Sequence, residues 1–242
     1  FWLLAGCAQA PEQEATGTAA AIIYGRDDRR DAFEAAAPFA DIARSTAVAL
    51  FAPSQLRRLP TGAYAVAEQS YGELETLCQG ERFAEQPAAA SCSGVLLTPR
   101  IVATAGHCLG VKPDGSIDCT NNRYVLGYTL DAPATLAQIE ADRVLDCKRV
   151  LVRVKSPADA SCRYDFALLE LERAAARGVP ATLRAARVEQ DEAVVVVGSP
   201  AGLPIKVDAG GRVIDARAEQ GDFFTLSSDT FAVSSGSGVF DA

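Results

Sequence analysis

The sequence predicts an all-β fold, and three observations support that class. Short runs rich in Val, Ile and Leu recur along the chain and end in Gly, Pro or polar clusters, which is typical of strands. Long helical periods are few. A chain of 242 residues with 49% apolar content can bury a sizeable core, as one all-β domain or as two small barrels. The runs expected to form strands are 45–51, 93–98, 100–105, 123–128, 149–154, 166–171, 193–198 and 211–218.

The Ala-rich stretch 172–190 divides these runs into two halves and is predicted to be a linker with some helical character. We expect the first half over about 40–172, the linker over about 173–190 and the second half from about 191.

The first residues predict export. Phe1–Ala5 are apolar but too few to span a bilayer, as at the end of a signal segment. Residues 4–7, "LAGC", resemble a bacterial lipobox, in which Cys7 is acylated and becomes the mature N-terminus, with 8–20 as a tether and the folded domain over 21–242. The alternative is an ordinary signal-peptide end with an incidental Cys. Both interpretations place the protein in an oxidising compartment, lipid-anchored in the cell envelope or extracellular.

The cysteines suit that compartment. Setting Cys7 aside leaves an even number, compatible with three disulfides. Zinc is the competing use, but the chain holds one His and no C-x-x-C pair, so no metal or other cofactor is expected. The six remaining cysteines are Cys78, Cys92, Cys108, Cys119, Cys147 and Cys162.

The net charge of −8 argues against a nucleic-acid partner, which would need clustered Lys and Arg.

The single histidine, His107, is a candidate general base. It lies at the end of an apolar run, "CSGVLLTPRIVATAGHC", directly before a cysteine. A bond between Cys92 and Cys108 would join two adjacent strands and hold the turn that carries the histidine. A general base needs such fixation, because a displacement of about 1 Å can cost about a hundredfold in rate. A packed or surface histidine is the alternative.

Asp165 opens the apolar run "DFALLEL". It is either a simple cap or the acceptor that orients the imidazole through its second ring nitrogen. In the second case we expect the apolar run to bury the carboxylate.

The order of "AGHC", "DFALLEL" and "SSGSGVF" resembles the His, Asp, Ser order of chymotrypsin-fold serine peptidases. Three further stretches, 22–34, 198–213 and 223–231, look more like the bacterial glutamyl-endopeptidase branch than the animal trypsins. The resemblance runs from about residue 21 to the chain end. It implies two six-stranded antiparallel β-barrels with the site in the cleft between them, the second barrel being incomplete at the end of this sequence.

The resemblance also selects among the serines. The family pattern is Gly-(Asp/Asn)-Ser-Gly, two more residues and an apolar pair, so anchoring on Val239–Phe240 makes Ser235 the nucleophile. Ser237 would require a shift of the strand by two residues.

Two positions depart from that pattern. The first Gly is Val233 here, and its backbone N–H is expected to form the oxyanion hole with that of Ser235. A β-branched residue restricts this backbone, so a misformed hole is a second expectation. Ser234 replaces the Asp that pairs with a new N-terminus in trypsin-like zymogens, so activation by that ion pair is not expected.

For substrate binding the resemblance implies Asp229 and Thr230, which lie six and five residues before Ser235, as the substrate-binding Asp of trypsins and Thr of glutamyl endopeptidases do. Solvent-facing turn residues are the alternative. Among the remaining cysteines, Cys147–Cys162 and Cys78–Cys119 are tentative pairs, since four cysteines allow three pairings.

The function implied is that of an exported serine endopeptidase acting on polypeptides through His107, Asp165 and Ser235. A catalytically inactive relative that binds peptides or proteins in the same cleft is the main alternative. A disulfide-linked envelope protein without a peptide site is a third. The sequence does not predict the oligomeric state.

Overall fold

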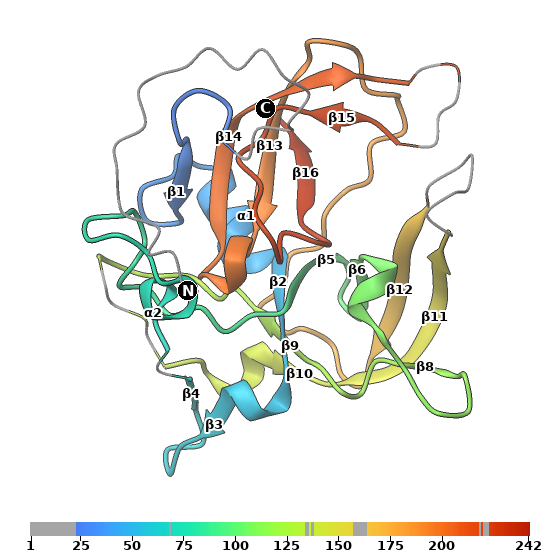
Figure 1. Cartoon of the computed structure of the whole chain (residues 1–242). Coiled ribbons are helices and arrows are strands. Elements are labelled where there is room, and N and C mark those ends of the chain that lie inside the picture. Colours follow the sequence, from blue (N-terminus) through green and yellow to red (C-terminus); the bar gives the residue numbers. More distant parts are fainter. Residues whose placement is uncertain are drawn as a thin grey trace, which may run out of the picture.

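Two antiparallel sheets organise the chain in the computed structural model, which describes residues 23–67, 69–133, 136, 138–156, 164–217, 219 and 223–242. Strands far outnumber helices in these ranges, so the predicted all-β class is confirmed. The two sheets pack against each other across the middle of the molecule (Figure 1). The predicted signal segment, the tether and Cys162 lie outside the described residues.

The first sheet has the strand order β10-β9-β2-β5-β6-β12-β11. It has seven strands where the resemblance implied six, because the two-residue β10 continues the sheet beyond β9. Its strands are β2 (Ala47–Phe51), β5 (Cys92–Thr98), β6 (Ile101–Thr104), β9 (Arg123–Leu126), β10 (Val144–Leu145), β11 (Cys147–Lys155) and β12 (Asp165–Leu171).

The second sheet has the order β1-β14-β13-β16, with β15 also paired to β14. Its first strand comes from the N-terminal segment, which the sequence did not predict to be a strand. No helix or strand is assigned over 173–190, so the expected helical character of the linker is absent there. The strands are β1 (Arg29–Asp31), β13 (Ala193–Gly198), β14 (Lys206–Asp215), β15 (Thr225–Leu226) and β16 (Gly238–Asp241).

The remaining elements are short. No helix among the described residues is long and apolar enough to cross a membrane. Helix α1 (Phe39–Ser45) buries Ala40 and Ala43. Helix α2 (Tyr71–Glu75) begins with a capping box between Ser70 and Glu73. The others are two hairpins, β3 (Leu56–Arg58) with β4 (Tyr64–Val66) and β7 (Gly110–Val111) with β8 (Ile117–Asp118), and the 3-10 turns η1 (Pro53–Gln55), η2 (Gly106–Cys108), η3 (Ala141–Arg143) and η4 (Pro200–Gly202).

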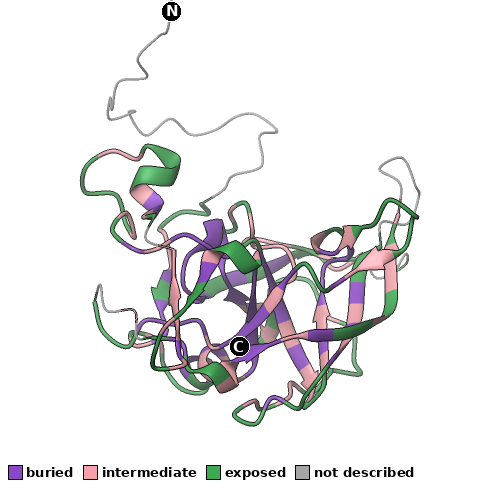
Figure 2. Ribbon diagram, turned by 90° about the horizontal axis from the view of Figure 1, so that it is seen from below, coloured by how far each residue is buried: buried purple, intermediate pink, exposed green. Residues whose placement is uncertain are grey.

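Strand β2 joins the cores of the two sheets. All five of its residues are buried, although a strand points alternate side chains to opposite faces. Val48 and Leu50 pack inside the first sheet. Ala49 and Phe51 pack on the other face against residues of the second sheet, including Val197. Buried residues accordingly gather in the strands at the centre of the molecule (Figure 2). The triad elements described below are therefore carried by two sheets that share one interface.

A buried ion pair fixes β1 to β14. Asp31 and Lys206 face each other in the strand register, and Lys206 Nζ lies 2.5 Å from Asp31 Oδ1. The same ammonium donates to Gln86 Oε1 at 2.6 Å. Burial lowers the pKa of Lys206 to about 8, although Asp31 opposes that change.

Two disulfides lie within the described residues. Cys92 and Cys108 are bonded, which ties the start of β5 to the end of η2. Cys119 is bonded to Cys147, so the tentative pairs Cys147–Cys162 and Cys78–Cys119 are wrong. The sequence separation of 28 residues between Cys119 and Cys147 gave no indication of this pair, because β8 approaches the start of β11 only in the folded sheet.

Candidate active site

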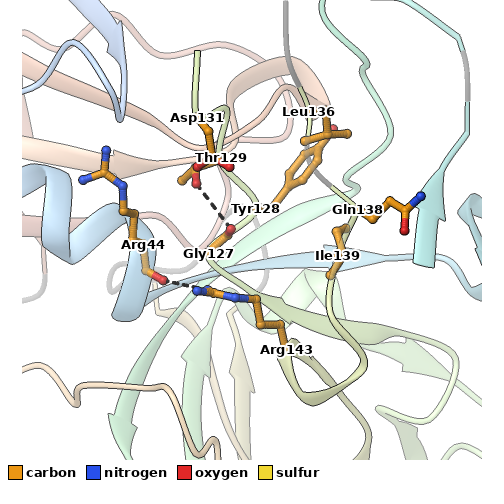
Figure 3. Close-up of a pocket in the computed structure, with 9 residues that line it drawn as sticks. All are labelled: Arg44, Gly127, Tyr128, Thr129, Asp131, Leu136, Gln138, Ile139 and Arg143. Atoms are coloured by element: carbon orange, nitrogen blue, oxygen red, sulfur yellow. Dashed lines mark hydrogen bonds between the residues drawn. The ribbon is translucent and has the colours of Figure 1, made fainter. Parts of the chain in front are cut away.

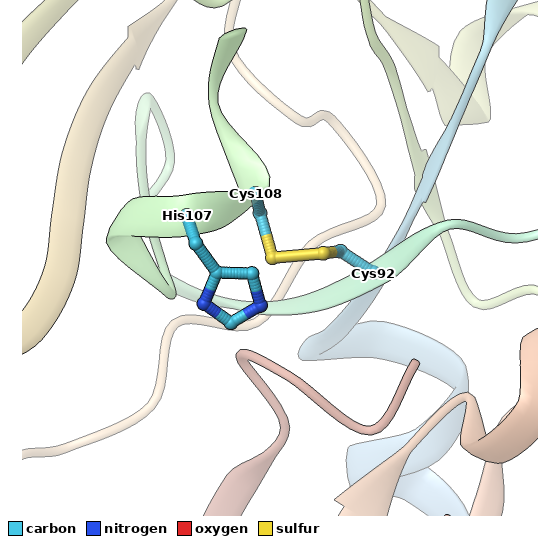
Figure 4. A group of neighbouring side chains, drawn as sticks. All are labelled: Cys92, His107 and Cys108. Carbon is cyan, nitrogen blue, oxygen red and sulfur yellow. A yellow bond between two sulfur atoms is a disulfide. The ribbon is translucent and has the colours of Figure 1, made fainter. Parts of the chain in front are cut away.

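His107 is held on a short turn between β6 and β7. Gly106 lets this turn approach β11 and β12, since a Cβ there would lie 2.4 Å from the carbonyl oxygen of Val154. On the other side the Cys92–Cys108 disulfide lies beside the imidazole ring (Figure 4). The two sulfur atoms and the ring would form the only group of possible metal ligands in the described parts of the chain, but the sulfurs bond to each other and are not thiolates.

The His107 turn has one further tether, from a residue that the sequence did not single out. Arg153, on β11, donates a 2.7 Å hydrogen bond from Nε to the carbonyl oxygen of Gly106. No local signal in the sequence could have shown this contact, because the two residues are 47 positions apart.

Asp165 begins β12 and contacts His107 twice. Its Oδ1 accepts a 2.9 Å hydrogen bond from the backbone N–H of His107, and its Oδ2 contacts the ring nitrogen Nδ1. A carboxylate only accepts hydrogen bonds, so this contact assigns the proton to Nδ1 and leaves Nε2 as an acceptor. The expectation that the Asp165 carboxylate is buried is wrong, however. The side chains of His107 and Asp165 are 40% and 39% exposed, and Asp165 is the first residue of β12, whose first two residues are both exposed.

Ser235 completes the group from the second half of the chain. Its Oγ lies 2.9 Å from His107 Nε2. Its carbonyl oxygen accepts a 2.8 Å hydrogen bond from the N–H of Ser93, which fixes it to β5. Gly236 must be a glycine here, since its φ is +85° and a Cβ would lie 2.1 Å from the Ser93 carbonyl. Three side chains, from turn η2, the start of β12 and the turn before β16, thus form one continuous row of contacts.

Ser237 has a different environment. Its Oγ is buried and has no hydrogen-bond partner among the described residues. It packs so closely on Gly198 that a Cβ at that glycine would lie 1.9 Å from it. The structure brings Ser235, and not Ser237, to the imidazole.

The serine turn, residues 231–237, contains a strained residue. Val233 has φ = +72°, a region that β-branched residues rarely adopt. The turn closes with a 3.1 Å hydrogen bond from Ser234 N–H to the Phe231 carbonyl, which makes Val233 its third residue, where a positive φ usually requires Gly. Within the described residues, neither Val233 N–H nor Ser235 N–H donates a hydrogen bond.

The carbonyl of the preceding residue explains how this conformation is held. Ala232 oxygen accepts a 2.6 Å hydrogen bond from Ala201 N–H, in the turn η4. A trans peptide points its C=O and N–H in opposite directions, so the Val233 N–H is turned away from Ala201. Both backbone amides expected for an oxyanion hole are therefore free of internal partners in the described structure.

Asp229 does not present a free carboxylate. It is buried, and its two oxygens accept hydrogen bonds of 2.8 Å each from the backbone N–H groups of Tyr24 and Asp28. The expectation that Asp229 binds a substrate side chain therefore needs correction, because the N-terminal segment already occupies the carboxylate. Thr230 is exposed, and its backbone N–H donates to Ser228 at 2.8 Å.

A separate cavity lies near the end of α1 and does not involve these residues. It measures about 100 Å³ and is lined by residues that include Arg44, Tyr128 and Arg143 (Figure 3). Arg143 Nη1 donates to the carbonyl oxygens of Arg44 and Leu126 at 3.1 and 3.4 Å. The backbone thus engages that guanidinium.

Comparison with solved structures supports the fold. The structure is similar to that of a Glu endopeptidase in complex with MPD, with a TM-score of 0.54 and 17% identity over 91% of this chain and 82% of that chain. Weaker likenesses are to an inactive form of the Rv3671c protease (TM-score 0.46, 14% identity, 84% and 76% covered) and to the VesB protease of Vibrio cholerae (TM-score 0.46, 17% identity, 78% and 44% covered). The curled antiparallel sheets agree with a chymotrypsin-like double β-barrel.

No curated protein matches the chain. A family model described as a trypsin-like peptidase domain matches residues 92–242, a range that contains His107, Asp165 and Ser235. Since this match covers more than half of the sequence, the chain belongs to the trypsin-like peptidase family.

Proposed function

We propose that the protein is a serine endopeptidase that cleaves polypeptides through a Ser235–His107–Asp165 triad. One observation carries this proposal: Ser235 Oγ lies 2.9 Å from His107 Nε2 while Asp165 contacts the opposite ring nitrogen. An unprotonated Nε2 within hydrogen-bond distance of a serine hydroxyl is what activation of that hydroxyl requires.

The reaction follows from these positions. Ser235 Oγ attacks the carbonyl carbon of the peptide bond as His107 Nε2 takes its proton, and Asp165 stabilises the resulting imidazolium. The imidazolium then gives the proton to the leaving amine, and the C–N bond breaks to leave an acyl ester on Ser235. Water, activated by the same imidazole, hydrolyses the ester and restores the serine.

The backbone amides of Val233 and Ser235 are the proposed oxyanion donors. Each is free of other partners in the described structure, and each such donor contributes about 3 kcal/mol to the transition state in related sites. The positive φ of Val233 is proposed to be the conformation that aims its N–H at the developing charge.

Export to the cell envelope or beyond is part of the proposal, with a lipid on Cys7 as the anchor. The two disulfides support an oxidising compartment. Substrates are proposed to be polypeptides, and Thr230 is the remaining predicted pocket residue.

The test is cleavage of a defined peptide mixture by the full-length protein, followed by mass spectrometry. We expect wild-type protein to generate new peptide ends, and the folded Ser235→Ala and His107→Ala variants to lose that activity. Binding of peptides without cleavage by wild type would instead support the inactive, peptide-binding relative.

A further inference from the structure

The N-terminal segment 24–31 contacts the serine turn and the residue two positions before it. Asp229, two residues before the turn, holds the backbone amides of Tyr24 and Asp28. Next to that contact, the guanidinium carbon of Arg29 lies 3.9 Å from the centre of the Phe231 ring. Residues some 200 positions apart in the chain are therefore in direct contact, a few residues before Ser235.

Arg29 is buried to an unusual degree for an arginine. Its side chain is 5% exposed, and it forms an ion pair with Asp27 at 2.8 Å. The guanidinium also lies over Phe83, 5.2 Å from that ring centre. Asp27 accepts from Nε and Nη2, whereas Nη1 is buried without a hydrogen-bond partner in the described residues.

The unpaired nitrogen Nη1 has a cost in stability. A buried donor without a hydrogen-bond partner loses its hydration, and the contacts of the guanidinium with the two rings offset only part of this loss. Replacing buried charged groups by apolar residues of similar volume is often neutral or stabilising. A buried arginine that keeps an unpaired nitrogen therefore suggests that the side chain serves the site beside it.

Phe231, which Arg29 contacts, is hydrogen-bonded across the serine turn to Ser234. The carbonyl oxygen of Phe231 accepts from Ser234 N–H at 3.1 Å, and the N–H of Phe231 donates to Ser234 Oγ at 3.3 Å. Both bonds set the conformation of Val233 and, through it, the direction of the Val233 and Ser235 amides. A shift of the Phe231 backbone would move the proposed oxyanion donors while leaving His107 and Asp165 in place.

We propose that Arg29 is a positioning residue for the serine turn: by stacking on Phe231 it holds the Val233 and Ser235 amides in the orientation that catalysis requires. The inference rests on the proposed function and adds to it a cation supplied by a side chain of the N-terminal strand. In the described structure Arg29 has no hydrogen bond or ion pair with His107, Asp165 or Ser235, so we assign its effect to the contact with Phe231.

The strand offers a matched control. Arg30 is the next residue of β1, and it is exposed where Arg29 is buried, because successive residues of a strand face opposite sides. Arg29→Met removes the charge and keeps an apolar side chain of similar length. Arg29→Lys keeps a cation that can still interact with the Phe231 ring.

The measurements are kcat and KM for a peptide substrate and the rate of fluorophosphonate labelling at Ser235, at a temperature well below each variant's Tm. We expect Arg29→Met to lower kcat and the labelling rate about 10- to 100-fold with little change in KM, since small displacements of catalytic groups cost this much. Arg29→Lys should recover part of the loss. Arg30→Met should stay within about twofold of wild type.

The outcomes separate the two proposals. No labelling of the folded wild-type protein would contradict the proposed function itself. Labelling of wild type with equal rates in Arg29→Met and Arg30→Met would overturn the role of Arg29 and leave the proposed function standing. A lower Tm with unchanged kcat would likewise show a structural role only. If Arg29→Met does not fold, Phe231→Leu removes the ring from the other side and should lower kcat in the same way.

Discussion

The carbonyl oxygen of Ala232 accepts a 2.6 Å hydrogen bond from the backbone N–H of Ala201. This bond joins the turn η4 to the serine turn and fixes the orientation of the 232–233 peptide. Ala201 itself has φ = +51° and is buried, so one left-handed residue supports another. The position at which the sequence lacks the expected glycine is thus held in a glycine-like conformation by its neighbour.

Val233→Gly should stabilise the protein by about 0.5–1 kcal/mol. Glycine removes a steric cost of about 1–2 kcal/mol at positive φ, and the greater freedom of the unfolded chain offsets about half of that gain. Urea unfolding measures the change. Val239→Gly, in β16, is the control and should destabilise by about 1 kcal/mol. Equal losses in both variants would contradict the strain at Val233.

The Ser235→Ala and Ser237→Ala variants should have very different kcat values. Loss of the Ser235 hydroxyl should lower kcat at least about 10³-fold, because no other hydroxyl of the described residues is hydrogen-bonded to His107 Nε2. Ser237→Ala should keep near wild-type kcat and stability, since its buried Oγ makes no hydrogen bond in the described structure. Steady-state peptide hydrolysis decides this, and a larger loss in Ser237→Ala would refute the assignment.

Removal of either disulfide should cost similar stability, but only one removal should lower kcat. The Cys–Cys separations of 16 and 28 residues predict similar losses of about 3 kcal/mol on removal. Only Cys92–Cys108 adjoins His107, so Cys92→Ala/Cys108→Ala should also lower kcat at temperatures where both variants are folded. Cys119→Ala/Cys147→Ala should keep kcat. Thermal unfolding and kcat are measured for each double variant. Equal kcat values would contradict the role of the Cys92–Cys108 disulfide in holding the His107 turn.

Stability should rise with pH above 8 because of Lys206. Its pKa is lowered to about 8 by burial, from 10.5, so between these values the unfolded chain binds more protons than the folded one. Between pH 7 and 9.5 the free energy of unfolding should increase by about 2 kcal/mol relative to Lys206→Met/Asp31→Asn, in which both charges are removed. Urea unfolding at the two pH values measures this difference. An equal change in the free energy of unfolding in both proteins would contradict the lowered pKa of Lys206.

The sequence was most informative where one residue type is rare or a motif is long. His107 is the single histidine, and Asp165 and Ser235 occur in stretches whose order resembles one peptidase fold. Residues from three distant stretches therefore converge as the resemblance implied. Three strands of the first sheet were also predictable, because β2, β5 and β12 each contain a short apolar run, "AVALF", "VLL" and "FALL".

Tertiary contacts determine the features that the sequence did not predict. The run "GRDDRRD" looks like a solvated charged segment, yet Arg29 and Asp31 are buried, because β1 pairs with β14 and alternates its faces. The Cys119–Cys147 pair and the contact of Asp229 with Tyr24 depend on which loops meet in space, which local pattern does not reveal. The exposure of Asp165 depends on its place at the end of a strand rather than on the apolar run after it.

The central claim is that Ser235 is an activated nucleophile, and mass spectrometry of the full-length protein after fluorophosphonate treatment tests it most directly. We expect one adduct per chain, mapped by peptide sequencing to Ser235 and absent from the His107→Ala variant. A folded protein that gains no adduct, or one that carries it on Ser237, would contradict the account.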